Sequence, residues 1–166
     1  KKVGDHVLDP GWTDKNKTVL YNRYNVLEML QNGTNAVGVI MGTGWYSNGQ
    51  YSLESESQGG HFLLQLEMES AQGEKQIVKS DLHDGWLVTS ETPIKKNSIY
   101  HGEIYDARDE LVGWDLPGYC PKPEEKWEEP LYFEPPAGVL KPQVMEPIRV
   151  KRLVKAKEYW QTGDNE

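Results

Sequence analysis

Glycine and proline interrupt this chain so often that long helices have little room to form. The 166 residues include 16 glycines and 10 prolines, which favour turns and end regular elements. Short segments rich in β-branched and aromatic residues stand between them, such as Thr18 to Asn25, and these are typical of strands. The sequence therefore predicts a mostly β protein, an antiparallel sandwich of short strands with one or two short helices, the first following Asn25.

Two further segments give more detailed expectations. His61 to Glu69 alternates apolar and polar residues, and a turn at Gln72-Gly73 leads to Lys75 to Ser80, which predicts an antiparallel hairpin. Asn35 to Met41 is almost continuously apolar. Such a run is typical of a strand buried on both faces, so we expect Asn35 to Met41 to lie in the core.

Composition excludes several classes of partner. The formal net charge of -8 disfavours nucleic acid, because binding to phosphates needs lysine and arginine to displace counterions. We expect no membrane partner either, since no apolar run approaches the roughly 20 residues of a membrane helix. Cys120 is the only cysteine, so the chain has no internal disulfide framework. A neutral ligand remains compatible with this composition.

Three tryptophans, Trp12, Trp45 and Trp114, each follow a glycine in a predicted loop or strand end. An indole face beside a carboxylate suits a sugar, because C–H groups pack on the ring while hydroxyls bond to fixed oxygens. The alternative is that these tryptophans fill the ends of the sandwich, since tryptophan is highly buried on average. The sequence leaves both interpretations open.

Oxygen donors for calcium recur near the start of the chain, where Asp5, Asp9 and Asp14 are followed by Asn16 and Asn22. Calcium prefers such oxygen ligands, although the spacing does not match an EF-hand loop. Aspartates that bond their own backbone in turns are the ordinary explanation. Calcium at Asp14 is thus a minority hypothesis, and no other cofactor is expected.

Acidic residues after position 102 raise the question of glycoside hydrolysis, which uses two carboxylates around one cleft. Glu103 and Asp106 would point to opposite faces of a strand, and Arg108 could pair with Asp106. We therefore expect a structural ion pair. Four histidines, at positions 6, 61, 83 and 101, lack the spacing of a zinc site and are expected at the surface or at strand ends.

Five segments, taken together, resemble the N-terminal accessory domain of bacterial α-L-rhamnosidases. The resemblance covers most of the chain in order and spacing, and it is weaker over residues 47–60 and 117–136. The segments that carry it are Val3-Gly4-Asp5 through Pro10-Gly11-Trp12-Thr13-Asp14, Tyr21 through Val26, Asn35-Ala36-Val37, Gly42-Thr43-Gly44-Trp45-Tyr46, and Gly102-Glu103-Ile104-Tyr105-Asp106-Ala107-Arg108.

The resemblance implies a jelly-roll-like (galactose-binding-like) β-sandwich that stands beside other domains of the parent chain, including a catalytic (α/α)6 barrel that removes terminal L-rhamnose with inversion. We expect residues 1–150 to be this domain, truncated on its N-terminal side, and 151–166 to be a strand or linker to the next one. Location is a guess from the family: periplasmic or extracellular, with the cytoplasm still open.

In some family members this sandwich holds L-rhamnose through an aspartate and a neighbouring asparagine, helped by calcium. Asp14 matches that aspartate, while Lys15 separates it from Asn16. The substrate-binding residues implied are thus Trp12, Asp14, Asn16, Trp45 and Tyr46, with Asp14 as the calcium ligand and L-rhamnose or a rhamnose-containing glycoside as the partner.

Three hypotheses remain at this stage. The first is a non-catalytic accessory domain that supports the hydrolase and recognises the sugar. The second is a purely architectural domain that packs on the catalytic barrel without a ligand. The third, for which the sequence gives least support, is that this chain itself hydrolyses glycosides through Glu103 or Glu110.

Overall fold

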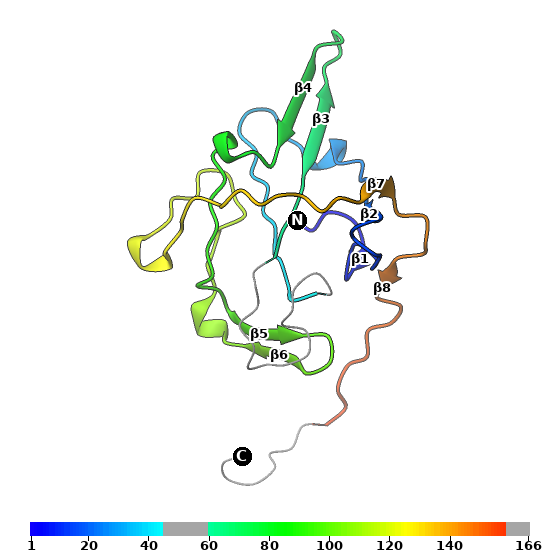
Figure 1. Ribbon diagram of the computed structural model, residues 1–166. Helices are drawn as coiled ribbons and strands as arrows, with labels where there is room; N and C mark the ends of the chain where they lie inside the picture. The colour runs from blue at the N-terminus through cyan, green and yellow to red at the C-terminus, as the bar shows by residue number, and fades with distance from the viewer. Residues whose placement is uncertain (45–59, 159–166) are drawn as a thin grey trace. The chain divides into compact units, whose positions relative to one another are not determined.

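The computed structural model describes residues 1–44 and 60–158. They divide into two compact units, one formed by Lys1–Val26 together with Ala137–Glu166 and the other by Leu27–Pro136. Within the described ranges the regular structure consists of eight short strands and four 3-10 turns, with no α-helix (Figure 1). The prediction of a mostly β chain is confirmed.

The first unit joins the two ends of the chain through two pairs of strands. β1 (His6–Val7) pairs antiparallel with β8 (Ile148–Arg149), and β2 (Thr18–Tyr21) pairs parallel with β7 (Val139–Pro142). The parallel pair departs from the expected antiparallel pattern. Leu20 in β2, at 9% exposed, is the one hydrophobic residue that counts as buried among those described.

Gly138 permits the close approach of β7 to the turn before β2. Its N–H donates to the carbonyl of Lys15 at 3.0 Å, and a Cβ at this position would come within 2.4 Å of that carbonyl oxygen and 2.7 Å of the Thr18 nitrogen. No side chain fits in that space, so the parallel pairing depends on glycine here.

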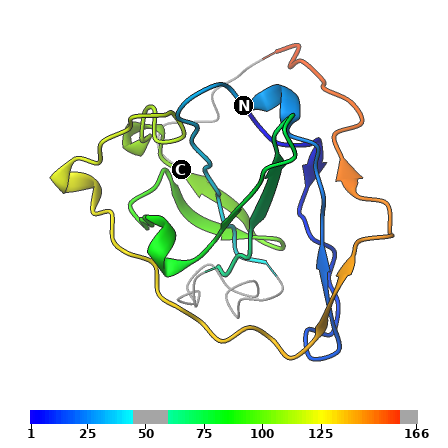
Figure 2. The same cartoon turned by 90° about the horizontal axis from the view of Figure 1, so that it is seen from above.

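The second unit contains two hairpins, visible from two directions in Figures 1 and 2. β3 (Gln65–Glu69) pairs antiparallel with β4 (Lys75–Lys79) around a turn with Gly73 at φ +82°, which confirms the predicted hairpin. β5 (Ile94–Ser98) pairs antiparallel with β6 (Gly102–Tyr105). Both pairs consist of neighbouring segments of sequence.

Single 3-10 turns connect these strands. They are η1 (Leu27–Met29), η3 (Leu82–Asp84), η4 (Ala107–Asp109) and η5 (Pro123–Glu125). η1 confirms that a short helix follows Asn25, but it is shorter than expected. Asp81 and Asp106 cap η3 and η4 by accepting backbone N–H bonds from His83 and Arg108, as short polar side chains commonly do.

The prediction of a core strand at Asn35 to Met41 is wrong. These residues have no strand assignment and all are exposed, with Ile40 at 70%. The backbone at Gly38 instead lies against the ring of Trp114, where a Cβ would come within 2.4 Å of the indole. An apolar run becomes a core strand only when other segments pair with it and cover it, and in the described chain none does.

Residues 151–158 are exposed and carry no strand assignment. The division of the chain at residue 150 and the jelly-roll arrangement of the sheets stay predictions.

Candidate functional site

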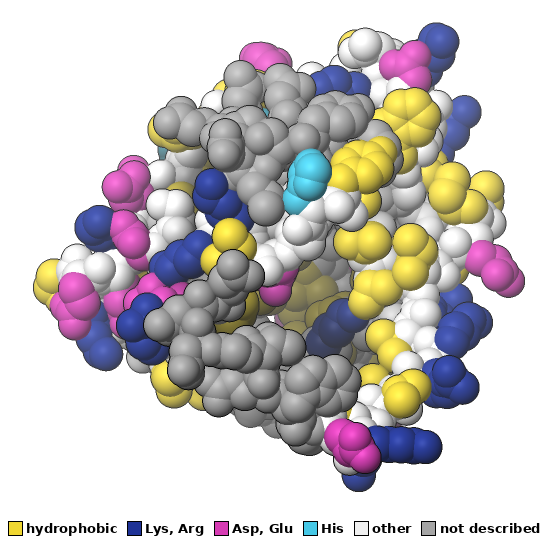
Figure 3. Space-filling model, turned by 90° about the horizontal axis from the view of Figure 1, so that it is seen from below, with side chains coloured by type: hydrophobic (Ala, Val, Ile, Leu, Met, Phe, Trp, Pro, Cys, Tyr) yellow, Lys and Arg dark blue, Asp and Glu magenta, His cyan; other side chains and the backbone are white. Residues whose placement is uncertain are grey.

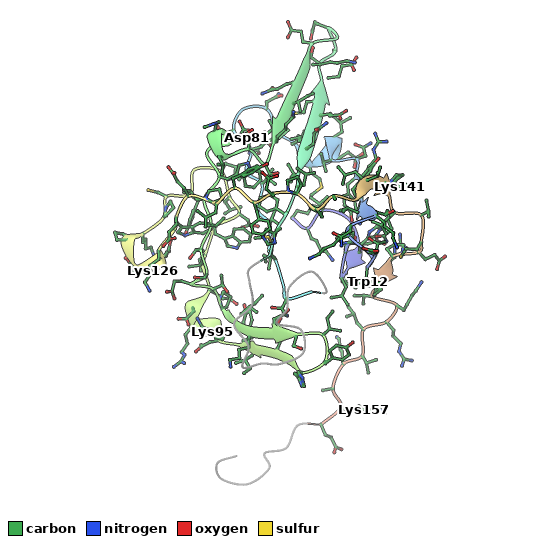
Figure 4. The ribbon with its side chains drawn as sticks, viewed as in Figure 1. Trp12, Asp81, Lys95, Lys126, Lys141 and Lys157 are labelled. Carbon is green, nitrogen blue, oxygen red and sulfur yellow. The ribbon has the colours of Figure 1, made fainter. Side chains whose placement is uncertain are left out.

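The loop that carries Trp12 is fixed on both sides of the indole. The Gly11 N–H donates to the side-chain oxygen of Gln143 at 2.8 Å, and Gly11 lies so close to the Met145 sulfur that a Cβ would come within 2.5 Å of it. On the other side, the Thr13 hydroxyl donates to the Thr18 carbonyl at 2.5 Å. Trp12 nevertheless remains 66% exposed (labelled in Figure 4), so a rigid loop presents it to solvent.

Asp14 closes the next turn of the same loop. Its Oδ1 accepts a hydrogen bond from the Asn16 N–H at 3.1 Å, and its Oδ2 lies 3.2 Å from the Lys17 ammonium. Its carbonyl accepts from the N–H groups of Lys17 and Thr18, both at 2.9 Å. The structure therefore brings Trp12, Asp14 and Asn16 into one ordered loop, in which Asp14 acts as a turn residue.

The donors near Asp14 suit a turn better than calcium, which the sequence offered only as a minority hypothesis. Calcium takes six to eight oxygen ligands, whereas Asp14 supplies one carboxylate that already faces a lysine ammonium. No group of three or more histidine, cysteine, aspartate or glutamate side chains suited to a metal occurs in the described part of the chain. Trp45 and Tyr46, the other two residues of the expected sugar site, lie outside the described residues.

Trp114 has a structural environment. Its ring lies over Gly38, as described above, and its side chain is half-buried. This corresponds to the second interpretation of the Gly-Trp pairs, in which the tryptophan fills a space in the protein. Among the described tryptophans of that set, Trp12 is therefore the one presented to solvent.

Sequence reasoning missed a polar cluster around His6. Its Nδ1 lies 2.6 Å from Asp9 Oδ2, and Tyr24 donates its hydroxyl hydrogen to the same oxygen at 2.8 Å. On the other side of the ring, Arg149 lies 3.3 Å from Nε2 and binds Asp5 at 2.7 Å. Both ring nitrogens of His6 therefore have polar partners, Asp9 at Nδ1 and Arg149 at Nε2.

The His6 cluster links β1 to β8, because His6 is opposite Arg149 in the strand register. Burial, followed by the hydrogen bond to Asp9, raises the pKa of Tyr24 to about 12. Tyr24 therefore remains protonated and keeps its donor at neutral pH. The cluster connects residues 5–24 to Arg149. Because Arg149 is far away in the sequence, no short-range spacing could have predicted this connection.

Glu103, Asp106 and Glu110 each have a partner within six residues. Arg108 binds Asp106 through two nitrogens, with distances from 2.5 to 3.1 Å, which confirms the expected ion pair. Glu110 accepts from the Tyr105 hydroxyl at 2.7 Å, and Glu103 accepts from the Asn97 amide at 3.2 Å. The bond to Arg108 holds the pKa of Asp106 below its usual value, the opposite of the shift that a general acid needs.

Comparison with known proteins identifies the family. The model for the alpha-L-rhamnosidase N-terminal domain matches residues 1–152. The chain belongs to this family. It is 36% identical over 121 residues to an alpha-L-rhamnosidase of Streptomyces avermitilis, covering 72% of this chain and 12% of that protein. It is also 30% identical over 160 residues to one of Formosa agariphila, covering 94% and 17%.

The fold agrees with that of a solved family member. The crystal structure of Streptomyces avermitilis alpha-L-rhamnosidase complexed with L-rhamnose superimposes with a TM-score of 0.64 and 29% identity, over 90% of this chain and 14% of that one. The chain thus spans only about one-eighth to one-sixth of the length of these relatives. In the described ranges no helix has the length and apolar character of a membrane span.

Proposed function

We propose that this chain is a non-catalytic accessory domain of a bacterial α-L-rhamnosidase and that it binds terminal L-rhamnose through the Trp12 loop. Hydrolysis by inversion then belongs to a catalytic barrel elsewhere in the parent protein, and residues 151–166 lead toward the next domain. The observation that supports the sugar-binding role is the exposed indole of Trp12, whose neighbours Gly11 and Thr13 are held by hydrogen bonds.

The chemistry of this loop suits a deoxy sugar. One face of L-rhamnose presents C–H groups and a methyl group, which pack on an aromatic ring, while its hydroxyls need polar partners. The exposed side chains of Asp14 and Asn16 lie within four residues of Trp12, and the pinned backbone lowers the ordering cost of binding. The relative crystallised with L-rhamnose supports this choice of sugar.

A purely architectural role is the second candidate, and exposed apolar side chains favour it. Hydrophobic side chains lie at the surface beside lysines and arginines (Figure 3); Leu131 and Val144 are each 92% exposed and Leu153 is 88% exposed. Apolar side chains exposed to this extent are available to pack against another protein surface. Other domains of the parent chain would supply that surface.

Titration calorimetry with L-rhamnose separates the two candidates. We expect binding in the millimolar range or tighter, weakened about tenfold by Trp12→Ala, since an aromatic contact contributes up to about 1.5 kcal/mol. Tyr132→Ala is the matched control, because Tyr132 is also an exposed aromatic residue, at 65%, and lies outside the loop. If both variants bound L-rhamnose with equal affinity, the sugar-binding proposal would be wrong and the architectural role would be the remaining candidate.

A titration with added calcium and a separate hydrolysis assay test the two remaining hypotheses. Because one carboxylate facing Lys17 makes a poor calcium ligand, added calcium should leave the affinity unchanged. A gain with calcium that disappears in Asp14→Ala would restore the calcium hypothesis. Turnover of an aryl rhamnoside by this chain alone, abolished in Glu110→Gln, would show that it is itself a hydrolase and would overturn the proposal.

A further inference from the structure

A polar groove lies within the second unit, between η4 and η5. Its volume is about 250 Å³. Lys95 on β5, Arg108 and Asp109 in η4, and Lys122 and Glu125 at η5 line it together with Glu91. Figure 4 labels Lys95 and Lys126, the latter just after η5. We call this the η4–η5 groove.

Ion pairs hold its walls in place. Lys95 lies 2.7 Å from Asp109, and Lys126 lies 2.5 Å from Glu91. These pairs link η4 to β5 and the end of η5 to the segment before β5. The donors and acceptors of the groove are therefore positioned before any ligand arrives, which lowers the ordering cost of binding.

Glu125 is the most constrained of these side chains. Only 10% of it is exposed, the Tyr119 hydroxyl donates to Oε2, and the Lys122 N–H donates to the same oxygen at 3.0 Å. The Thr89 hydroxyl holds its carbonyl at 2.7 Å. A carboxylate buried in this way needs such partners, and they hold Glu125 in a fixed position in the groove lining.

The lining selects the chemistry of a ligand. Five carboxylates and three cations line the groove, so an anion meets net repulsion. Leu111 is its one apolar lining residue, which leaves little surface for an apolar compound. A hydroxyl group donates to a carboxylate and accepts from an ammonium at the same time. A neutral molecule with several hydroxyls therefore satisfies these walls.

Size narrows the choice further. Pockets for drug-sized ligands measure roughly 300–1,000 Å³, and about 250 Å³ suits a single ring. We propose that the η4–η5 groove is a second carbohydrate subsite, which takes one neutral sugar residue through its hydroxyls. It does not depend on the Trp12 loop, and its η5 wall lies in residues 117–136, where the resemblance to the family is weaker.

Hydrogen–deuterium exchange of the full-length parent protein locates the ligand. The probes are methyl α-L-rhamnoside as the neutral sugar, a methyl uronide as the acidic sugar, and inorganic phosphate. The neutral glycoside should slow exchange at least twofold in peptides spanning residues 105–111 and 122–126, and the two anions should not. A matched neutral acyclic polyol tests whether the ring is required.

Paired variants assign the effect to each loop. Lys95→Gln with Lys122→Gln should abolish protection in the groove peptides and leave protection of residues 11–18 intact, whereas Trp12→Ala should do the reverse. Lys75→Gln, which removes an exposed lysine on β4, is the control. Unprotected groove peptides at saturating glycoside, or stronger protection by the uronide, would overturn the groove subsite without touching the Trp12 proposal.

Discussion

The two units of this chain are held together by contacts that span different lengths of sequence. The first is held by partners far apart in sequence: Gly11 bonds Gln143 across 132 residues and Asp5 bonds Arg149 across 144. The second contains two hairpins whose strands follow one another directly, and its contacts between distant segments span fewer residues, such as the 54 between Thr43 and Asn97. The Trp12 loop therefore depends on both ends of the chain, whereas the η4–η5 groove depends on contacts within one continuous stretch.

Substitution at Gly138 should break the first unit most severely. A methyl group there meets the Lys15 carbonyl and the Thr18 nitrogen, so Gly138→Ala should destabilise the β2·β7 pair by about 1–3 kcal/mol. Faster amide exchange at Thr18–Tyr21 is the measurement. Gly44→Ala, where a Cβ meets nothing within 4 Å, is the control. Unchanged exchange at β2 in Gly138→Ala would mean that the close approach is not what holds this unit.

Substitution of a glycine in the second unit should destabilise the fold less, and its effect should be confined to one hairpin. Gly73 has φ +82° and open space around its missing Cβ, so Gly73→Ala should cost about 1 kcal/mol through backbone strain alone. Exchange should rise only in β3 and β4. Gly73→Asn should recover part of the loss, because asparagine tolerates this conformation. Equal effects of Asn and Ala would contradict the strain argument.

High pH should weaken the first unit slightly. The pKa of Tyr24 rises to about 12 in the folded chain, so the folded state holds this proton more tightly and stability should fall as pH rises from about 10 to 12. Tyr24 is 38% exposed, and screening keeps the effect below about 1 kcal/mol. The measurement is urea unfolding of the chain and of Tyr24→Phe across this range.

The difference between those two proteins isolates Tyr24, because the pKa values of Tyr105 and Tyr119 are raised as well. The Phe variant should lose the extra pH dependence. If both proteins respond identically, Asp9 and Tyr24 do not interact in the way described.

Sequence patterns predicted what is local. The β3–β4 hairpin follows from strict alternation and one Gln-Gly turn, and the Asp106–Arg108 pair follows from two neighbouring charges. The parallel β2·β7 pair and the His6 cluster could not be predicted, because nothing near His6 points to Arg149. The prediction of a core strand at Asn35 to Met41 was wrong for a related reason. Apolar composition indicates burial, but it does not show which other segment would cover these residues.

The loop of the candidate sugar site was predicted, whereas its binding of a sugar stays a proposal. The sequence placed Trp12, Asp14 and Asn16 in one loop, and the structure agrees. It could not show that Asp14 is already engaged by Asn16 and Lys17, since turn bonds and ligand bonds use the same oxygens. The η4–η5 groove had no motif, because its walls come from three separate segments.

Because His6 pairs with Arg149, β1 is synthesised long before its partner strand. As the nascent polypeptide leaves the ribosome, both hairpins of Leu27–Pro136 are complete before residue 139 exists, whereas β1 and β2 must wait for the last strands. The Trp12 loop thus cannot acquire its final shape until Gln143 and Met145 have been made. A chain whose synthesis stops before residue 139 can contain both hairpins, but it lacks the residues that hold the Trp12 loop in place.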